Sequence, residues 1–141
     1  MLVRLLYASC AAEEITSKEL DDILEKSREN NPDAGITGLL CVADDVYIQV
    51  LEGGRVEVCD LYNTIVRDGR HSDVCLLQFE EISERLFGQW TMGRADISRI
   101  NPVLLLKYFE KPALHPFDAS GNATMALLTE IETGAIVTRP E

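Results

Sequence analysis

Several features common to nucleic-acid-binding and membrane proteins are missing from this sequence of 141 residues. Basic residues are few, 13 against 24 acidic ones, and the net charge of −11 argues against nucleic acid or an anionic membrane surface as the main partner. The longest apolar runs, residues 46–51 and 103–106, are too short to span a bilayer. We therefore expect a cytoplasmic protein that binds neither nucleic acid nor membrane.

Residues that support metal, redox or nucleophilic chemistry are also scarce. The 4 cysteines form no CxxC pair, and the only histidines are His71 and His115, so we expect reduced thiols and no metal site. A nucleophile-elbow signature for acyl transfer is absent. Gly53-Gly54 precedes a predicted helix and is a weak candidate for holding a phosphate, because the rest of the Walker pattern is missing.

What remains is the pattern of one globular domain, since 46% of the residues are hydrophobic. Thr16 and Glu19 form a capping box that begins a helix, and Pro32 is expected to end this helix at Asn31. A second helix is predicted to end near Asp68. Alternating apolar residues predict strands over 2–9, 35–42, 46–51, 74–80 and 89–94.

This β-α-β-β-α-β-β order predicts a ferredoxin-like α+β sandwich. Its mixed five-stranded sheet carries two helices on one face, and the first and third strands lie side by side in the middle. Two further helices, over 103–109 and 120–132, are predicted to cover the other face, which is apolar. We therefore divide the chain into a domain of residues 1–97 and a helical cap of residues 98–141.

Two polar side chains interrupt apolar strand faces: Tyr7 lies beside Leu5, and Gln49 lies between Tyr47 and Leu51. If this face packs against the helices, the phenol and the carboxamide need hydrogen-bond partners. The alternative is that Gln49 faces solvent and Tyr7 is an ordinary core residue.

Three other features each have a functional and a purely structural interpretation. Asn30-Asn31 either ends a helix or points two amides between the helices. The segment from Asp68 to His71 either borders the same cleft or is a solvated turn. Trp90 and Met92 alternate on the predicted fifth strand, where they either fill the core or contact a site.

Together these residues resemble the BLUF family of flavin-binding blue-light sensors, over about two thirds of the chain. Residues 101–141 are similar to the helical extension of short, single-domain members. The matching pieces are Arg4-Leu-Leu-Tyr7, Asn30-Asn31-Pro32, Gly35-Ile-Thr-Gly-Leu-Leu40, Tyr47-Ile-Gln49-Val-Leu-Glu-Gly53, Ile65-Val-Arg-Asp-Gly-Arg-His71 and Trp90-Thr-Met92.

The resemblance implies a flavin between the two helices. It implies that Tyr7 donates a hydrogen bond to Gln49, that Gln49 bridges to flavin N5 and O4, and that Asn31 holds the pyrimidine edge of the ring. FAD is the cofactor that the family name implies, FMN is possible, and Arg67 and Arg70 are candidates for contacting the phosphates. The other cofactor-binding residues implied or expected are Ile23, Ser27, Asn30, Leu51, Ile65, Asp68, Arg70 and His71.

The implied activity is photoreception without turnover, so the chain is not expected to be an enzyme. Light-driven electron and proton transfer from Tyr7 rearranges the hydrogen bonds of Gln49, and Trp90 or Met92 relays the change to a separate protein. A homodimer is possible. The alternatives are a light-insensitive protein-interaction module and an acylphosphatase-like hydrolase that uses Asn31 and Arg70 on phosphate.

Overall fold

Five strands form a single mixed sheet in the computed structural model of the chain, which describes residues 1–89 and 91–133. The spatial order is β4-β1-β3-β2-β5, so the first and third strands are neighbours in the middle, as predicted. Every neighbouring pair is antiparallel except β2 and β5, which are parallel. The strands are β1 (Leu2–Ala11), β2 (Thr37–Ala43), β3 (Val46–Gly54), β4 (His71–Ile82) and β5 (Gly93–Asp96).

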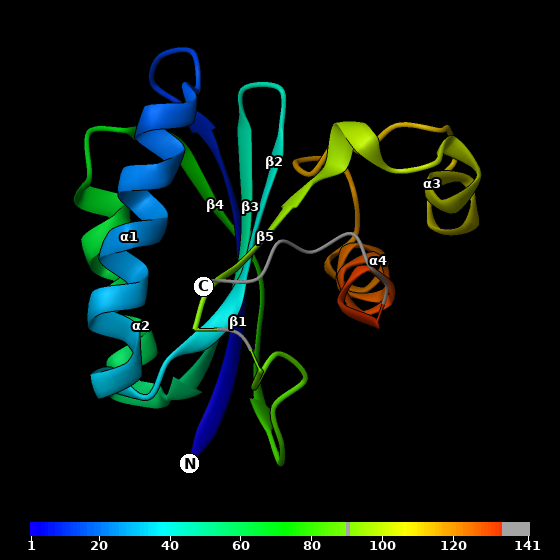
Figure 1. Cartoon of the computed structure of the whole chain (residues 1–141). Coiled ribbons are helices and arrows are strands. Elements are labelled where there is room, and N and C mark those ends of the chain that lie inside the picture. The colour runs from blue at the N-terminus through cyan, green and yellow to red at the C-terminus, as the bar shows by residue number, and fades with distance from the viewer. Residues whose placement is uncertain (90, 134–141) are drawn as a thin grey trace.

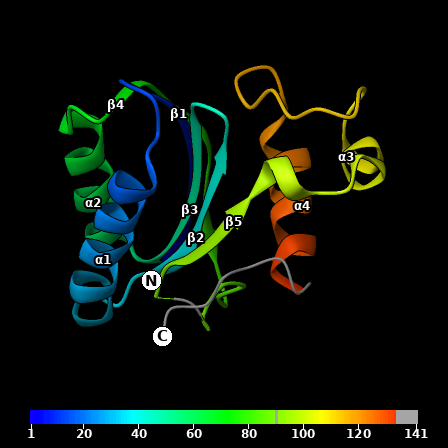
Figure 2. The same ribbon diagram turned by 45° about the horizontal axis from the view of Figure 1, so that its top comes forward.

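The helices divide between the two faces of the sheet (Figure 1). Helices α1 (Ser17–Ala34) and α2 (Arg55–Arg67) lie together on one face. Helix α4 (Gly121–Thr133) lies on the other face, and η1 (Ile97–Arg99) and α3 (Pro102–Tyr108) lead to it (Figure 2). This arrangement is the predicted ferredoxin-like α+β sandwich with a C-terminal helical extension. Over residues 1–89 and 91–133, no helix has the length and apolar character needed to cross a membrane.

Helix α1 begins where the sequence predicts but ends later. The Thr16 hydroxyl accepts from the backbone N–H of Glu19, which confirms the N-cap. The expected end at Asn31 is wrong, because the helix continues through Pro32 to Ala34. A proline near a helix end removes only one backbone bond. Gly35, with a φ of 69°, then closes the helix by donating its N–H to the carbonyls of Asn31 and Pro32.

Strand β3 runs three residues further than predicted and includes the glycine pair. Gly53 and Gly54 lie opposite Val3 and Leu2 of β1, and Gly54 is also the N-cap residue of α2. The Glu57 carboxylate lies against Gly54, so close that a Cβ there would be 2.4 Å from its oxygen. The glycine pair is therefore a strand end that meets a carboxylate, and this negative charge argues against the weak phosphate-site interpretation.

The fifth strand differs most from the prediction. It runs over Gly93–Asp96 rather than over residues 89–94, so Met92 lies in the bend before it. Trp90 lies outside the described residues. The prediction that Trp90 and Met92 alternate on one strand is consequently wrong for Met92.

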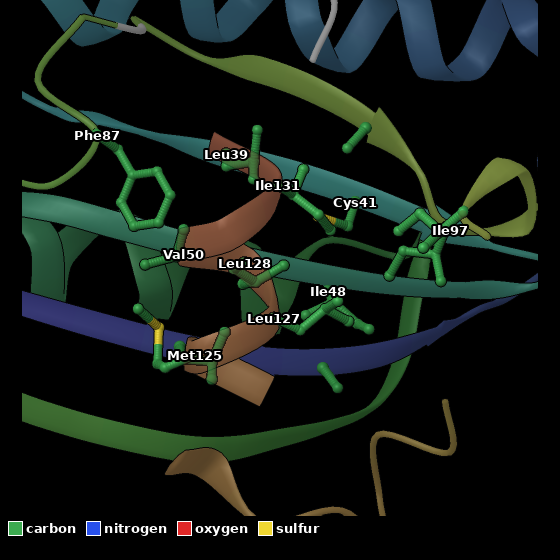
Figure 3. Packing of buried hydrophobic residues seen from close by; sticks show 14 of the residues in the cluster. Leu39, Cys41, Ile48, Val50, Phe87, Ile97, Met125, Leu127, Leu128 and Ile131 are labelled. Atoms are coloured by element: carbon green, nitrogen blue, oxygen red, sulfur yellow. The ribbon is translucent and has the colours of Figure 1, made fainter. Parts of the chain in front are cut away.

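Two apolar clusters, one on each face, form the core. The helix-side cluster joins Val3, Leu5 and Leu51 of the sheet to Leu24 of α1 and Val58 of α2. The α4-side cluster covers the face that was predicted to need a cap (Figure 3). Its main members are Leu6, Leu39, Ile48, Val50, Phe87, Leu127, Leu128 and Ile131, each 0% exposed. The cap is thus confirmed, whereas its boundary after residue 97 stays a prediction.

Candidate functional site

A cavity of 230 Å³ lies between α1 and α2, over the central strands β1 and β3. Apolar side chains of both helices form its walls, and polar side chains gather at its floor and at one rim. Its lining residues are Tyr7, Ile23, Lys26, Ser27, Asn30, Asn31, Leu40, Tyr47, Gln49, Leu61, Thr64, Ile65, Asp68, Arg70 and His71.

The floor of the cavity holds a buried tyrosine–glutamine pair. Tyr7 and Gln49 are directly opposite each other in β1 and β3, and both side chains point to the helix side. The Tyr7 hydroxyl donates a hydrogen bond to Gln49 Oε1. Tyr7 is 1% and Gln49 4% exposed, so the alternative in which Gln49 faces solvent is wrong. Burial raises the pKa of Tyr7, which keeps its phenol a protonated donor.

The segment before β5 closes one side of this floor. Gln49 Nε2 donates to Met92 Sδ at 3.3 Å, and Asn31 Nδ2 donates to the carbonyl of Thr91 at 3.1 Å. Two adjacent residues thus contact both of the buried carboxamides in the site. Met92 is part of the helix-side cluster and 0% exposed, so its thioether is a fixed acceptor at the glutamine.

An acidic and a basic side chain pair at the rim. The Arg70 guanidinium donates to both carboxylate oxygens of Asp68, the shorter contact being 2.6 Å. The bonds from Arg70 lower the pKa of Asp68 to about 2. These bonds use the Nε and Nη2 donors of Arg70, which lines the cavity, and its contact to the cofactor phosphates stays a prediction. Arg67 is exposed and does not line the cavity.

His71 connects the rim with the floor. Its Nδ1 lies 2.8 Å from the Ser9 hydroxyl, and its ring packs on Tyr47 with centroids 4.9 Å apart. Burial is the main cause that lowers the pKa of His71, which favours the neutral imidazole.

Most of the predicted cofactor-binding residues line the cavity, whereas Leu51 and the candidate phosphate contact Arg67 do not. Leu51 packs inside the helix-side cluster with 0% exposure and does not reach the cavity. Sequence reasoning missed five lining residues, although simple periodicity indicates three of them. Tyr47 shares the strand face of Gln49, Leu61 is one helical turn from Ile65, and Lys26 is one turn from Asn30. The five are Lys26, Leu40, Tyr47, Leu61 and Thr64.

The cavity suits a flat aromatic ligand that has polar edges. Its aliphatic walls (Ile23, Leu61, Ile65) suit the faces of a ring system, and the amides of Asn31 and Gln49 supply both donors and acceptors. The hydroxyl of Tyr47 is buried and has no hydrogen-bond partner among the described residues. A buried hydroxyl without a partner is unfavourable, and a polar ligand edge would satisfy it. These properties fit an isoalloxazine ring.

Comparison with known proteins identifies the family. The family model described as "BLUF: Sensors of blue-light using FAD" matches residues 2–93. The chain belongs to the BLUF family. BLUF domains are sensor modules, not catalytic ones, and the prediction that the chain is not an enzyme agrees with this membership.

Among the curated BLUF relatives is the photoactivated adenylate cyclase subunit beta of Euglena gracilis, which is 32% identical over 95 residues. The match covers 67% of this chain and only 11% of that protein. Two solved structures align over nearly the whole chain. BlsA in its photo-activated state has a TM-score of 0.87 and 28% identity, and the alignment covers 100% of this chain and 99% of that one. The dark state of BlrB has a TM-score of 0.76 and 29% identity, with 92% of each chain covered.

Proposed function

We propose that the protein is a blue-light photoreceptor in which Tyr7 and Gln49 are the photoactive pair beside a non-covalently bound flavin. The observation that carries this proposal is the buried hydrogen bond from the Tyr7 hydroxyl to Gln49 Oε1 at the cavity floor. Bound flavin would supply absorption of blue light and, when excited, oxidising power. The tyrosine and the glutamine supply the groups that respond.

Tyr7 is the proposed electron and proton donor. Its hydroxyl is held in a fixed direction by Gln49, and its ring packs against Tyr62 with centroids 5.7 Å apart. Because burial raises its pKa, the phenol keeps its proton in the dark. Gln49 is the group whose hydrogen bonds change, since a carboxamide exchanges donor for acceptor when it rotates or changes tautomer. The change amounts to one or two hydrogen bonds, about 1–3 kcal/mol, so reversal in the dark is expected.

The residues proposed to hold the flavin are those that line the cavity. Asn31 is the proposed contact to the pyrimidine edge, and Ile23, Ser27 and Ile65 are the proposed contacts to the ring faces. We propose FAD, the cofactor that the family description names, and mass spectrometry of the released cofactor distinguishes it from FMN.

The proposed output passes from Gln49 through Met92 to the C-terminal cap and then to a separate protein. Met92 directly precedes β5, and β5 leads into η1, whose Ile97 belongs to the α4-side cluster. A homodimer, a cap that begins at residue 98, and the absence of nucleic-acid and membrane partners belong to the same proposal.

Neither alternative function has a comparable observation behind it. An acylphosphatase-like site needs an arginine and an asparagine directed at phosphate, whereas the Arg70 guanidinium pairs with the Asp68 carboxylate and the Asn31 amide donates to the carbonyl of Thr91. If the protein were an interaction module without a chromophore, no ligand would satisfy the buried Tyr47 hydroxyl.

Absorption spectroscopy of the purified protein tests the proposal. We expect a yellow protein whose flavin bands shift to the red under blue light and return in the dark. A colourless protein that takes up no added flavin would contradict the proposal, and release of phosphate from an acyl phosphate would support the hydrolase instead.

A further inference from the structure

A buried charge cluster lies on the opposite face of the sheet from the cavity, and the proposed photoreaction makes no use of it. Glu52 of β3 is 0% exposed and Arg4 of β1 is 8% exposed. The two residues are directly opposite each other, and Arg4 Nη2 lies 2.8 Å from Glu52 Oε2. Glu52 is only three residues from Gln49 on the same strand.

The Glu52 carboxylate also accepts two backbone hydrogen bonds from a distant segment. The N–H of Leu86 donates to Oε2 at 3.0 Å and the N–H of Phe87 donates to Oε1 at 2.8 Å. Arg85 adds a third link, because its Nη1 donates to the Glu52 carbonyl at 3.4 Å and to Thr37 Oγ1 at 2.9 Å. The Glu52 carboxylate therefore fixes two consecutive residues of the connection between β4 and β5, and the Glu52 backbone carbonyl holds the Arg85 side chain beside them.

The described part of that connection, residues 83–89 and 91–92, also carries the residues that meet the photoactive site. Thr91 accepts from Asn31, and Met92 accepts from Gln49. Phe87 is buried with Val50 in the α4-side cluster (Figure 3), whereas Met92 is buried in the helix-side cluster. The connection thus joins both faces of the sheet, with Glu52 holding its first half and Gln49 in contact with its last residue.

We propose that Glu52 is a positioning residue for the photoreaction. By holding the N–H groups of Leu86 and Phe87, it fixes the connection so that Met92 Sδ stays in reach of Gln49 Nε2. This inference rests on the proposed function, since it assigns Glu52 a part in the response of Gln49.

Stability alone is a weak explanation for such a pair. A buried carboxylate and guanidinium lose their hydration, and well-packed apolar residues often stabilise a core equally well. A carboxylate does what no apolar residue does, because it accepts several N–H bonds at once and so fixes a segment in one register. Holding Met92 Sδ within reach of Gln49 Nε2 requires a segment that is fixed in this way.

Dark-recovery kinetics of the flavin-loaded full chain test the inference. The variant Glu52→Gln keeps the shape of the side chain but removes its charge and one acceptor. We expect it to bind flavin, to show the red shift, and to recover about fivefold more slowly, the factor expected for one neutral hydrogen bond. Recovery slows because the amide of Gln49 returns without its fixed partner. Met92→Leu, which removes only the sulfur acceptor, is expected to slow recovery similarly.

The double variant separates positioning from general destabilisation. If Glu52 acts through Met92, then Glu52→Gln with Met92→Leu recovers no more slowly than the slower single variant. If recovery of the double variant is slowed by the product of the two single-variant factors, the inference is overturned. Glu80→Gln is the matched control, because Glu80 bonds the same arginine at 2.9 Å but has a 43% exposed side chain. We expect normal recovery from it, and slowing equal to that of Glu52→Gln would also overturn the inference.

Three further outcomes bear on the inference. If Glu52→Gln does not fold, Glu52→Asp replaces it, because it keeps the charge for Arg4 but withdraws the carboxylate from Leu86 and Phe87; recovery at the wild-type rate would overturn the inference. A wild-type chain that binds flavin without any red shift would overturn both this inference and the proposed function. If the wild type shows a reversible red shift and Glu52→Gln recovers at the wild-type rate, this inference alone is overturned.

Discussion

Tyr7 and Gln49 lie directly opposite each other in neighbouring antiparallel strands, and the phenol donates to the carboxamide at the floor of the cavity. Cross-strand partners of this kind have their Cβ atoms only about 5 Å apart, so the backbone itself brings the two groups together. The pair is buried, and the other end of the Gln49 carboxamide, Nε2, donates to Met92 Sδ. Tyr7, Gln49 and Met92 therefore form one continuous chain of hydrogen bonds, the route that we propose for the response to light.

Replacing the carboxamide tests the part assigned to Gln49. We expect Gln49→Leu to keep its flavin, because the side chain is of similar size, and to lose the light-induced red shift, because no amide is left to rearrange. The shift is measured as a light-minus-dark absorption spectrum. Gln78→Leu is the control, since Gln78 bonds Asn122 of the cap and does not line the cavity. A normal shift in Gln49→Leu would remove Gln49 from the mechanism.

Asn31 is expected to matter more for holding the cofactor than for responding to light. Its side chain is 3% exposed and lines the cavity. We expect Asn31→Ala to lower flavin occupancy after purification more than Tyr7→Phe or Gln49→Leu does. Occupancy is the ratio of flavin to protein absorbance. The exposed Asn63 of α2 provides the control Asn63→Ala, and equal occupancy in the two variants would contradict the prediction.

Replacing Tyr47 is expected to weaken flavin binding without destabilising the flavin-free protein. Burial is the main cause that raises its pKa to about 12, so its hydroxyl is a donor at neutral pH, and it has no partner among the described residues. Tyr47→Phe should leave the flavin-free protein as stable as before, or more stable. It should weaken flavin binding about fivefold, the loss of one hydrogen bond. Unchanged affinity in a flavin titration would show that this hydroxyl does not contact the cofactor.

The architecture could be predicted from periodicity, but the ends of several elements could not. The capping box at Thr16 marks the start of α1 by a local hydrogen bond. Its end is set by Gly35, whose left-handed conformation closes the helix three residues after Pro32, and a rule about the residue before a proline does not include that. The sequence position of β5 was likewise missed, because that strand is short and is fixed by parallel pairing with β2.

The candidate site was predictable where strand alternation and the family resemblance agreed. Alternation places Tyr7 and Gln49 on one face, and the cavity lies on that face. The same alternation also suggested Leu51, which is buried in the core one step beyond the cavity. The attachment of Leu86 and Phe87 to Glu52 was not predictable, because the contact joins residues 34 and 35 positions apart in the sequence.

Acid titration tests the pair at the rim. Asp68 has an ordinary pKa of 3.8 that falls to about 2 in the folded protein, mainly through bonds from Arg70. A lowered carboxylate pKa stabilises the fold above pH 3.8, and this stabilisation is lost as the pH falls toward 2. We expect the free energy of unfolding of Asp68→Asn to be lower than that of the wild type by roughly 1–2 kcal/mol at pH 7. This difference between the two proteins is expected to fall by about half at pH 3. Urea unfolding of both proteins at the two pH values measures this difference. An equal difference at pH 7 and pH 3 would contradict the lowered pKa of Asp68.

The light-minus-dark absorption spectrum of Tyr7→Phe, recorded beside that of the wild type at equal flavin occupancy, tests the central claim most directly. The substitution removes one oxygen atom and leaves the cavity otherwise intact, so flavin is expected to remain bound. We predict a reversible red shift in the wild type and none in Tyr7→Phe, because the variant lacks the hydroxyl that donates to Gln49. A red shift of ordinary size and lifetime in Tyr7→Phe would contradict the account.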